Sequence, residues 1–318
     1  YRALGRLYRG IIVPDLRQYV MLGDAGSQTD QISSRELVGS KLSPKKQGEL
    51  VDDRWVFTED NPNRELRVAG GLAAAARVLK TYNPGLAKES LDTALAIYEG
   101  SYSKATNVGT KAFALAELYL STQEEKYLDI LAAMEADIVK HIRHAGWPIG
   151  RVMSSVKNTA FKSAISDAVK KLQLSLNDEA SSTPYGVPYK PNIWGAGWGI
   201  QEFGVKQYFF STAWPQFASE ALYVSALNFV LWTHPGSNNL SFASGVGSKS
   251  ALVAYGVNRA DWSFIPGGVI SGTALIRPDF PELKNWPFFW QQTEYVMGGG
   301  ATNYMFLVLA VDHLMQKK

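Results

Sequence analysis

The feature that most constrains the fold is a succession of amphipathic helical segments that come in pairs. The pair 111–120 and 124–141 is joined by the short polar link 121–123, whereas long stretches rich in Gly, Pro and aromatic residues stand at alternate junctions. Helices joined by short links pack as antiparallel neighbours. The pattern therefore predicts an all-α fold, a toroid of helical hairpins whose long loops gather on one rim and can form a groove.

The helical segments are recognised by their periodicity and their ends. The Ala-rich segment 64–80 follows Asn61-Pro62-Asn63, a combination typical of a helix N-terminus. In 86–98 the apolar residues recur with the spacing of one buried helical face. The expected helices are 64–80, 86–98, 111–120, 124–141, 161–174, 217–232 and 302–315. Because no linker or break in composition divides the chain, residues 1–318 are expected to form a single domain.

The composition excludes several classes of protein. The net charge of +3 comes from 32 basic and 29 acidic residues that are scattered along the chain, which argues against a nucleic-acid partner. Cysteine is absent, so disulfides, thiolate nucleophiles and Cys-ligated zinc are excluded, and four histidines disfavour a three-His metal site. No apolar run approaches the roughly 18 residues that a membrane span requires.

The most informative segment for chemistry is 286–295, which precedes three consecutive glycines and the last expected helix. Glu294 stands there between aromatic residues, at the entry to the helix. Burial among apolar groups disfavours a charged carboxylate and raises its pKa, which is what a general acid requires. From these residues alone, a helix cap or an ion pair with an arginine is an equally good interpretation of Glu294.

Two further segments are candidates for contacts with a ligand. The stretch 244–268 places Arg259 and Trp262 between glycine-rich turns, which indicates backbone that approaches a ligand closely. Its glycines form neither a P-loop nor a dinucleotide fingerprint. Trp194 and Trp198 have small neighbours and stand just before a helical stretch, so their indole faces could stack on sugar rings. Burial in the core or an ordinary turn would explain the same composition.

Together these residues resemble the family 9 glycoside hydrolases. The run 286–304 is similar to the C-terminal active-site signature of that family, in which a Glu-Tyr pair opens the last helix. The run 234–259 is similar to the loop that ends in the family's His-His-Arg element. Trp198-Gly199 is similar to the Trp-Gly pair that precedes a late helix in the family. The segment 23–55 resembles its groove-lining stretch, so the likeness covers nearly the whole chain.

The resemblance implies an (α/α)6 toroid and a bacterial enzyme that is secreted, periplasmic or at the cell surface. It also implies hydrolysis of β-1,4-glucans such as cellulose with inversion at the anomeric carbon, and Glu294 would donate the proton to the glycosidic oxygen. No cofactor would be required; the family often binds calcium through loop oxygens, although the chain has no EF-hand-like spacing. The residues that would bind the substrate are Arg259, Tyr295, Trp198, Trp55, Trp194 and Trp262.

The general base is the point at which the sequence departs from the family. Inversion needs a second carboxylate about 6.5–9.5 Å from the acid, and the family takes it from an Asp-Ala-Gly-Asp motif near the start of the domain. In the segment 24–27 a serine stands at the fourth position. We therefore expect the base motif and the first helices of the ring to lie before Tyr1, in an N-terminal segment that would complete the site. Asp24, Glu59 and Asp60 are the alternatives within the chain.

Two other departures concern the substrate. Asn258 stands where the family usually has a histidine, and Thr293 replaces the Asn that often precedes the catalytic Glu. Contacts to the sugar would then differ from those of ordinary endoglucanases. Two alternatives remain open: a carbohydrate-binding protein that kept the toroid and lost turnover, and a lyase or different hydrolase on the same fold. A lyase would need a positioned Tyr or His beside an acidic sugar.

Overall fold

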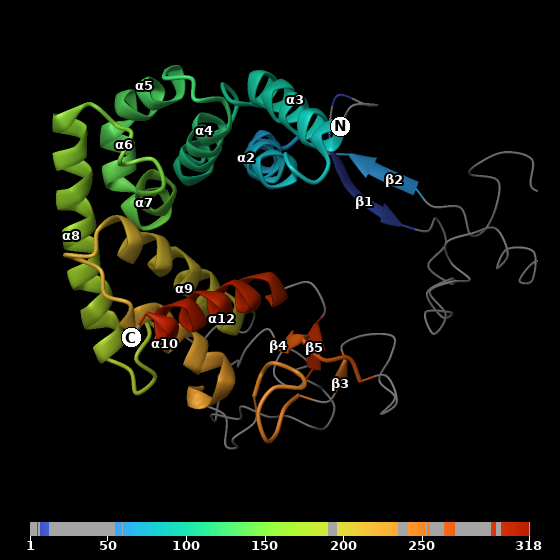
Figure 1. Cartoon of the computed structure of the whole chain (residues 1–318), viewed down its shortest axis with the longest axis vertical. Helices are drawn as coiled ribbons and strands as arrows, with labels where there is room; N and C mark the ends of the chain where they lie inside the picture. The colour runs from blue at the N-terminus through green and yellow to red at the C-terminus, as the bar shows by residue number, and fades with distance from the viewer. Residues whose placement is uncertain are drawn as a thin grey trace, which may run out of the picture. The chain divides into compact units, whose positions relative to one another are not determined.

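The computed structural model describes residues 5, 7–12, 55–58, 60–189, 196–234, 241–251, 253–254, 264–270, 294–296 and 300–317. By its internal contacts the chain divides into two compact units, Tyr1–Thr106 and Asn107–Lys318. Helices account for most of the regular structure within the described residues, and short strands form two small sheets (Figure 1). The fold is therefore all-α, as the pairing of helical segments predicts. The expectation of one domain over 1–318 stays a prediction.

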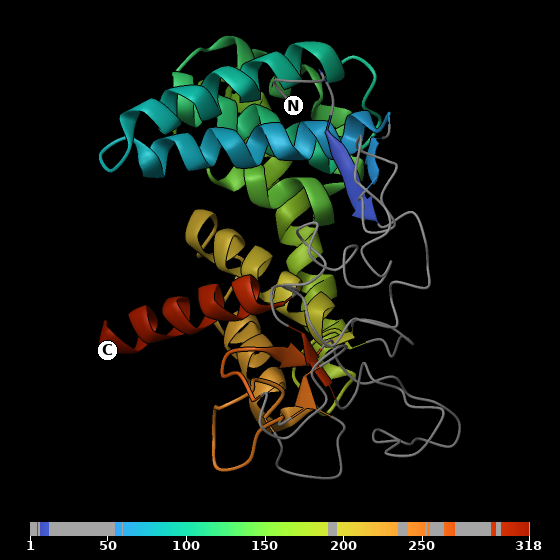
Figure 2. The same ribbon diagram turned by 90° about the vertical axis from the view of Figure 1, so that its right-hand side faces the viewer.

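The first unit contains a strand pair and a helical hairpin. Strands β1 (Tyr8–Ile12) and β2 (Trp55–Thr58) are antiparallel, with Ile12 opposite Trp55. Helices α2 (Pro62–Leu79) and α3 (Pro84–Ser101) lie side by side along their lengths (Figure 2). These helices confirm the expected segments 64–80 and 86–98.

Local chemistry explains where α2 and α3 begin. Each helix starts with a proline that an asparagine precedes, and the side chain of that asparagine caps the helix. Asn61 Oδ1 accepts a hydrogen bond from the amide of Arg64 at 3.0 Å, and Asn83 Oδ1 accepts one from Leu86 at 3.1 Å. A capping side chain satisfies an amide that has no partner inside the helix, and proline suits the first helical position because it has no N–H to satisfy.

The second unit holds the remaining helices. Its elements are α4 (Val108–Thr122), α5 (Lys126–Ala133), α6 (Glu135–Lys140), α7 (Ile142–Gly150), α8 (Thr159–Ser181), α9 (Ala196–Ala213), α10 (Ala221–Asn228), the π-helical turn η3 (Phe229–Thr233) and α12 (Ala301–Gln316). The segments expected near α4, α8 and α12 are confirmed, and α8 extends further than expected on its C-terminal side. The segment expected as one helix over 124–141 is divided into α5 and α6, and the one expected over 217–232 into α10 and η3.

Alternate helices of this unit pack in parallel. Between α4 and α7, the rings of Phe113 and Trp147 are 5.4 Å apart, and Glu117 Oε1 is 2.7 Å from Arg151 Nε. Both residue numbers rise together along the contact, so the two helices run in the same direction. The same parallel order joins α7 to α9, where Gly146 lies against Phe210 and Gly150 against Trp214. It also joins α9 to α12, where Trp198 lies against Gly300 and Gly204 against Leu307.

A row of parallel helices requires the chain to return between one member and the next, and α5, α6, α8 and α10 supply the returns. A helix, a returning helix and a parallel neighbour make the repeating unit of a ring built from helical hairpins. The arrangement in this unit thus agrees with the hairpin organisation that the sequence predicts.

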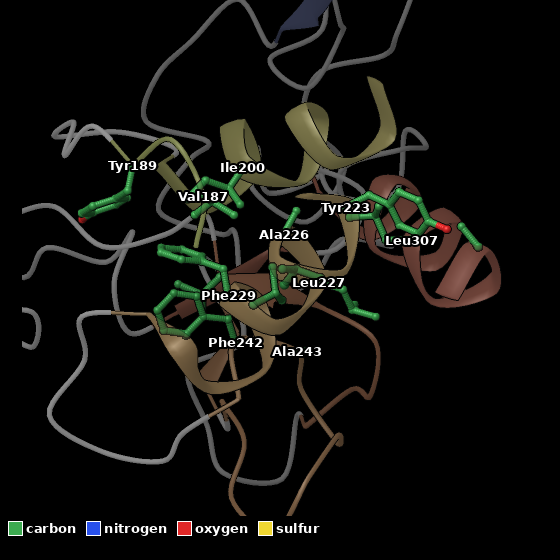
Figure 3. Packing of buried hydrophobic residues seen from close by; sticks show 14 of the residues in the cluster. Val187, Tyr189, Ile200, Tyr223, Ala226, Leu227, Phe229, Phe242, Ala243 and Leu307 are labelled. Atoms are coloured by element: carbon green, nitrogen blue, oxygen red, sulfur yellow. The ribbon is translucent and has the colours of Figure 1, made fainter. Parts of the chain in front are cut away.

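Helix α9 lacks a single apolar face, which is why its bounds are not evident from the sequence. It contacts α7, α10 and α12, so apolar side chains are required on several sides. Figure 3 shows Ile200 from α9, Ala226 from α10, Phe229 from η3 and Leu307 from α12 in one core cluster, all of them buried. This core fixes α9 against α12.

A small sheet completes the second unit. Its strands are β3 (Val253–Ala254), β4 (Val269–Ile270) and β5 (Glu294–Val296), in the order β3-β5-β4. The buried Ser244 side chain joins two loops beside the sheet, because its Oγ donates to the carbonyl of Ile265 at 2.7 Å and accepts from the amide of Gly268 at 2.8 Å. The glycine-rich stretches around 244–248 and 264–268 are therefore packed together.

Candidate functional site

Strand β5 carries Glu294 and Tyr295 in the centre of the small sheet. Val253 of β3 is the parallel partner of Glu294, and Ile270 of β4 is the antiparallel partner of Tyr295. The expectation that Glu294 stands at the entry to the last helix is wrong, because α12 begins only at Ala301.

The other residues expected at the site are placed as follows. Trp198 lies in the first turn of α9, inside the helix that it was expected to precede, and Trp55 begins β2 in the first unit. Arg259, Trp194 and Trp262 lie outside the described residues, as do Asp24 and Glu59. Asp60 is exposed before α2. Within the second unit, the structure places Glu294, Tyr295 and Trp198 on elements that lead into, or pack against, the N-terminus of α12.

Gly300, the residue that caps α12, approaches α9 very closely. A Cβ atom at Gly300 would stand 2.6 Å from Trp198 Cδ1, 2.9 Å from Trp198 Nε1 and 2.9 Å from Gln201 Nε2. Side-chain carbons do not normally come this near to other heavy atoms, so only glycine fits. Trp198 is half-buried at this contact. The edge of the Trp198 indole that carries Cδ1 and Nε1 packs against Gly300, and part of the side chain stays exposed to solvent.

Gln201 is the residue at this contact that the sequence analysis did not single out. It is 0% exposed, and neither its amide oxygen nor its amide nitrogen has a hydrogen-bond partner among the described residues. The indole N–H of Trp198 also lacks one there. The signal in the sequence that could have identified Gln201 is its spacing from Trp198. Residues three apart on a helix lie on one face, so Gln201 shares the face of Trp198 once both are in α9.

Electrostatics around α12 leave its tyrosine uncharged. Burial raises the pKa of Tyr304, one turn into α12. Its phenol therefore stays protonated in neutral solution and can donate a hydrogen bond. Its own amide donates to the carbonyl of Gly300 at 2.9 Å, the first such bond of the helix.

The ion pair between Glu117 and Arg151 joins three helices of the second unit. Glu117 is almost fully buried, and the Arg151 guanidinium lies 5.0 Å above the ring of Phe209 on α9. A guanidinium that pairs with a carboxylate and lies over an aromatic ring holds both neighbours in place. The pair ties α4 to α7 and α9.

Among the described residues, no group of three or more metal-ligating side chains comes together. In the same part of the chain, no helix combines the length and the apolar character needed to cross a membrane.

Comparison with known proteins gives the fold. No protein-family model and no curated protein matches the chain. Solved structures do match: a family 9 glycoside hydrolase of Bacteroides ovatus has a TM-score of 0.66 at 16% identity over 98% of this chain. The family 9 endoglucanase J30 has a TM-score of 0.62 at 17% identity over 81% of it. The cellulase Cel9M of C. cellulolyticum has a TM-score of 0.60 at 14% identity over 93% of it.

These similarities show an all-α fold of the (α/α)6 toroid class that family 9 enzymes share. The fold class expected from the sequence is therefore confirmed. The chain spans 55% of the length of J30, 59% of the B. ovatus protein and 83% of Cel9M. At these identities the likeness concerns the fold, and the assignment of catalytic roles rests on the residues themselves.

Proposed function

We propose that this chain belongs to a glycoside hydrolase that cleaves β-1,4-glucosidic bonds with inversion, and that Glu294 is its general acid. The observation that carries the proposal is that Glu294 lies in β5, just before α12 in the chain, and that Gly300 at the start of α12 packs against Trp198. The solved structures of similar fold are described as endoglucanases and a cellulase, which supports a β-glucan as the substrate.

In the proposed reaction, protonated Glu294 donates its proton to the glycosidic oxygen while that bond to the anomeric carbon breaks. A second carboxylate removes a proton from a water molecule, which attacks the opposite face of the sugar and inverts the configuration. Trp198 offers a partly open indole face on which a sugar ring can stack. We assign Tyr295 and Arg259 to orient the sugar hydroxyls, and Trp55, Trp194 and Trp262 as further platforms.

The general base is proposed to lie upstream of Tyr1, with Asp24, Glu59 and Asp60 as the alternatives inside the chain. Secretion or display at the cell surface suits an enzyme whose substrate is a polymer. Calcium bound through loop oxygens is an additional proposal, and its test is the change in melting temperature on addition of a chelator.

The proposal is tested by release of reducing sugar from soluble β-glucans. The comparison uses this chain, a longer chain that carries residues upstream of Tyr1, and Glu294→Gln in each. Glutamine keeps the shape of Glu294 but has no proton to give, so kcat should fall by roughly 10²–10⁴. Glu202→Gln, which changes an exposed carboxylate of α9, is the matched control and should leave kcat unchanged.

Each outcome assigns a role. If only the longer wild-type chain cleaves, the base lies upstream of Tyr1. If this chain cleaves unaided, Asp24→Asn, Glu59→Gln and Asp60→Asn identify the base. If the longer chain binds oligosaccharides but cleaves none, the protein is a carbohydrate-binding relative on the same fold, and the proposed function is wrong.

A further inference from the structure

Two unsatisfied features meet where α9 packs against α12. The first is Gln201, a primary amide that is 0% exposed and has no partner among the described residues for either polar atom. The second is the N-terminus of α12, where no side chain in the described part of the chain caps the helix. A buried polar group without a partner costs about 1–3 kcal/mol, and native proteins rarely leave one so. Each feature therefore calls for a partner.

The two features are close enough to satisfy each other. The distance of 2.9 Å between Gln201 Nε2 and the Cβ position of Gly300 places the amide directly against the residue that begins the helix. The first amides of an α-helix, here those of Ala301, Thr302 and Asn303, have no carbonyl acceptor within the helix. A carboxamide can turn about its Cγ–Cδ bond and exchange the places of its oxygen and nitrogen. That rotation would bring an acceptor, Gln201 Oε1, toward these donors.

A ligand from solution is a poor alternative partner for this amide. Both of its polar atoms are buried, so a solute from solution does not reach them in this structure. Among the described residues, the N-terminus of α12 is the backbone that lies against this amide at Gly300.

We propose that Gln201 is the cap of α12, supplied in trans from the neighbouring helix α9, and that this cap positions the segment that carries Glu294. The role of Glu294 rests on the proposed function, whereas the cap itself does not. The connection between β5 and α12 has two ends. Pairing with β3 and β4 holds β5 at the first end, and the proposed cap would hold Gly300 at the second. Gln201 is in this sense a positioning residue, since it acts on the substrate only through Glu294.

The close approach at Gly300 supports this role. A glycine at this position lets the backbone of α12 come within reach of a side chain on α9, and any larger residue would separate the two. The indole of Trp198 lies against the same glycine, so two side chains of α9 pack on the first turn of α12.

The test measures hydrogen exchange of the amides of Ala301, Thr302 and Asn303 together with kcat and KM on a soluble β-glucan. Gln201→Met keeps the approximate length of the side chain and removes its hydrogen bonds. Gln207→Met is the matched control, because Gln207 is also buried on α9 and its amide oxygen has no partner within the described ranges, but it lies further along the helix. Gln201→Glu keeps an acceptor at the cap, where the helix dipole favours negative charge.

With a trans cap, Gln201→Met speeds exchange of the three amides about 10-fold relative to Gln207→Met, as loss of a hydrogen bond of typical strength predicts. It also lowers kcat by about 10-fold with little change in KM, and Gln201→Glu restores slow exchange. Equal exchange in the two Met variants would overturn the cap. Faster exchange with an unchanged kcat would overturn the positioning role. If the wild-type protein cleaves no β-glucan, the proposed function fails and the exchange measurement still decides whether Gln201 caps α12.

Discussion

The α2–α3 hairpin and the α9–α12 contact are both packed helix pairs, but they differ in how their polar groups are paired. In the hairpin the polar groups at the ends are paired: asparagines cap both helices, and Ser101 donates to the buried Glu65 at 2.5 Å. Between α9 and α12, a buried amide and an indole N–H have no partners among the described residues, and none of the described side chains caps the helix N-terminus. Local pairing of this kind serves stability, whereas departures from it are expected at functional sites. The difference separates a supporting part of the molecule from its candidate site.

Among substitutions in these two regions, Gly300→Ala is expected to change stability and activity the most. The added Cβ would meet the Trp198 ring and the Gln201 amide at distances below 3.0 Å, so α9 and α12 must separate. Overpacking of this kind costs about 3 kcal/mol of unfolding free energy, the upper end of its usual range. We also expect activity to fall, because the segment that carries Glu294 must move. Chemical denaturation and reducing-sugar assays measure the two effects.

Gly199→Ala is the control for that change. No atom of the described residues lies within 4 Å of a Cβ at Gly199, which is in the same turn of α9 as Trp198. Alanine is the better helix former, so stability should rise by about 0.5–1 kcal/mol. If both variants lost stability equally, the close approach at Gly300 would not be the cause.

A smaller effect, confined to stability, is expected from Ser101→Ala. It removes the hydroxyl that satisfies Glu65 inside the hairpin and should cost about 2 kcal/mol. Specific activity per folded molecule should stay unchanged, because Ser101 and Glu65 are not among the residues proposed to bind or cleave the substrate. Ser181→Ala, which removes an exposed hydroxyl bonded to the carbonyl of Asp178, is the matched control and should change stability little. A large loss of activity in Ser101→Ala would mean that the hairpin does more than support.

Loss of one helix cap should have a more modest effect still. Asn83→Ala removes the acceptor for the amide of Leu86 and should lower the unfolding free energy by about 1 kcal/mol. Asn83→Asp keeps an acceptor and should retain most of the stability. If Ala and Asp had the same effect, the asparagine side chain would not be what stabilises the start of α3.

The smallest effect is a pH dependence at His144 on α7. Burial, followed by the positive charges of Lys206 and Arg143, lowers the pKa of His144. The unfolded chain then binds a proton more readily than the folded one, so this contribution to stability is present above about pH 6.5 and is lost as pH falls below it. In His144→Gln the melting temperature should fall less between pH 7 and pH 5 than in the wild type. An identical pH profile for the two proteins would rule this contribution out.

The contrast between the two regions also explains what the sequence could predict. The start of α2 follows from Asn61-Pro62, a local signal that acts over three residues, and α3 follows from the helical spacing of its apolar residues, so the pattern predicts both helices. Helix α9 is apolar on several sides because it packs against three other helices, and no period in its own sequence shows this. For the same reason Trp198 was expected before the helix and lies within it.

The candidate site was predictable in part. Aromatic neighbours and glycines single out Glu294, but its strand depends on pairing with residues of β3 and β4 from distant parts of the chain. Gln201 was missed because an isolated glutamine carries no motif. Its significance appears only when Gly300 is brought against it by tertiary packing.

The most direct test of the central claim is the stereochemistry of the first product. Proton NMR of a soluble β-1,4-glucan in the presence of active enzyme, in this chain or the longer one, should show the α-anomer of the new reducing end first. Glu294→Gln should show no such signal on the same time scale. A β-anomer formed first, an unsaturated product, or full activity in Glu294→Gln would contradict an inverting hydrolase with Glu294 as its acid.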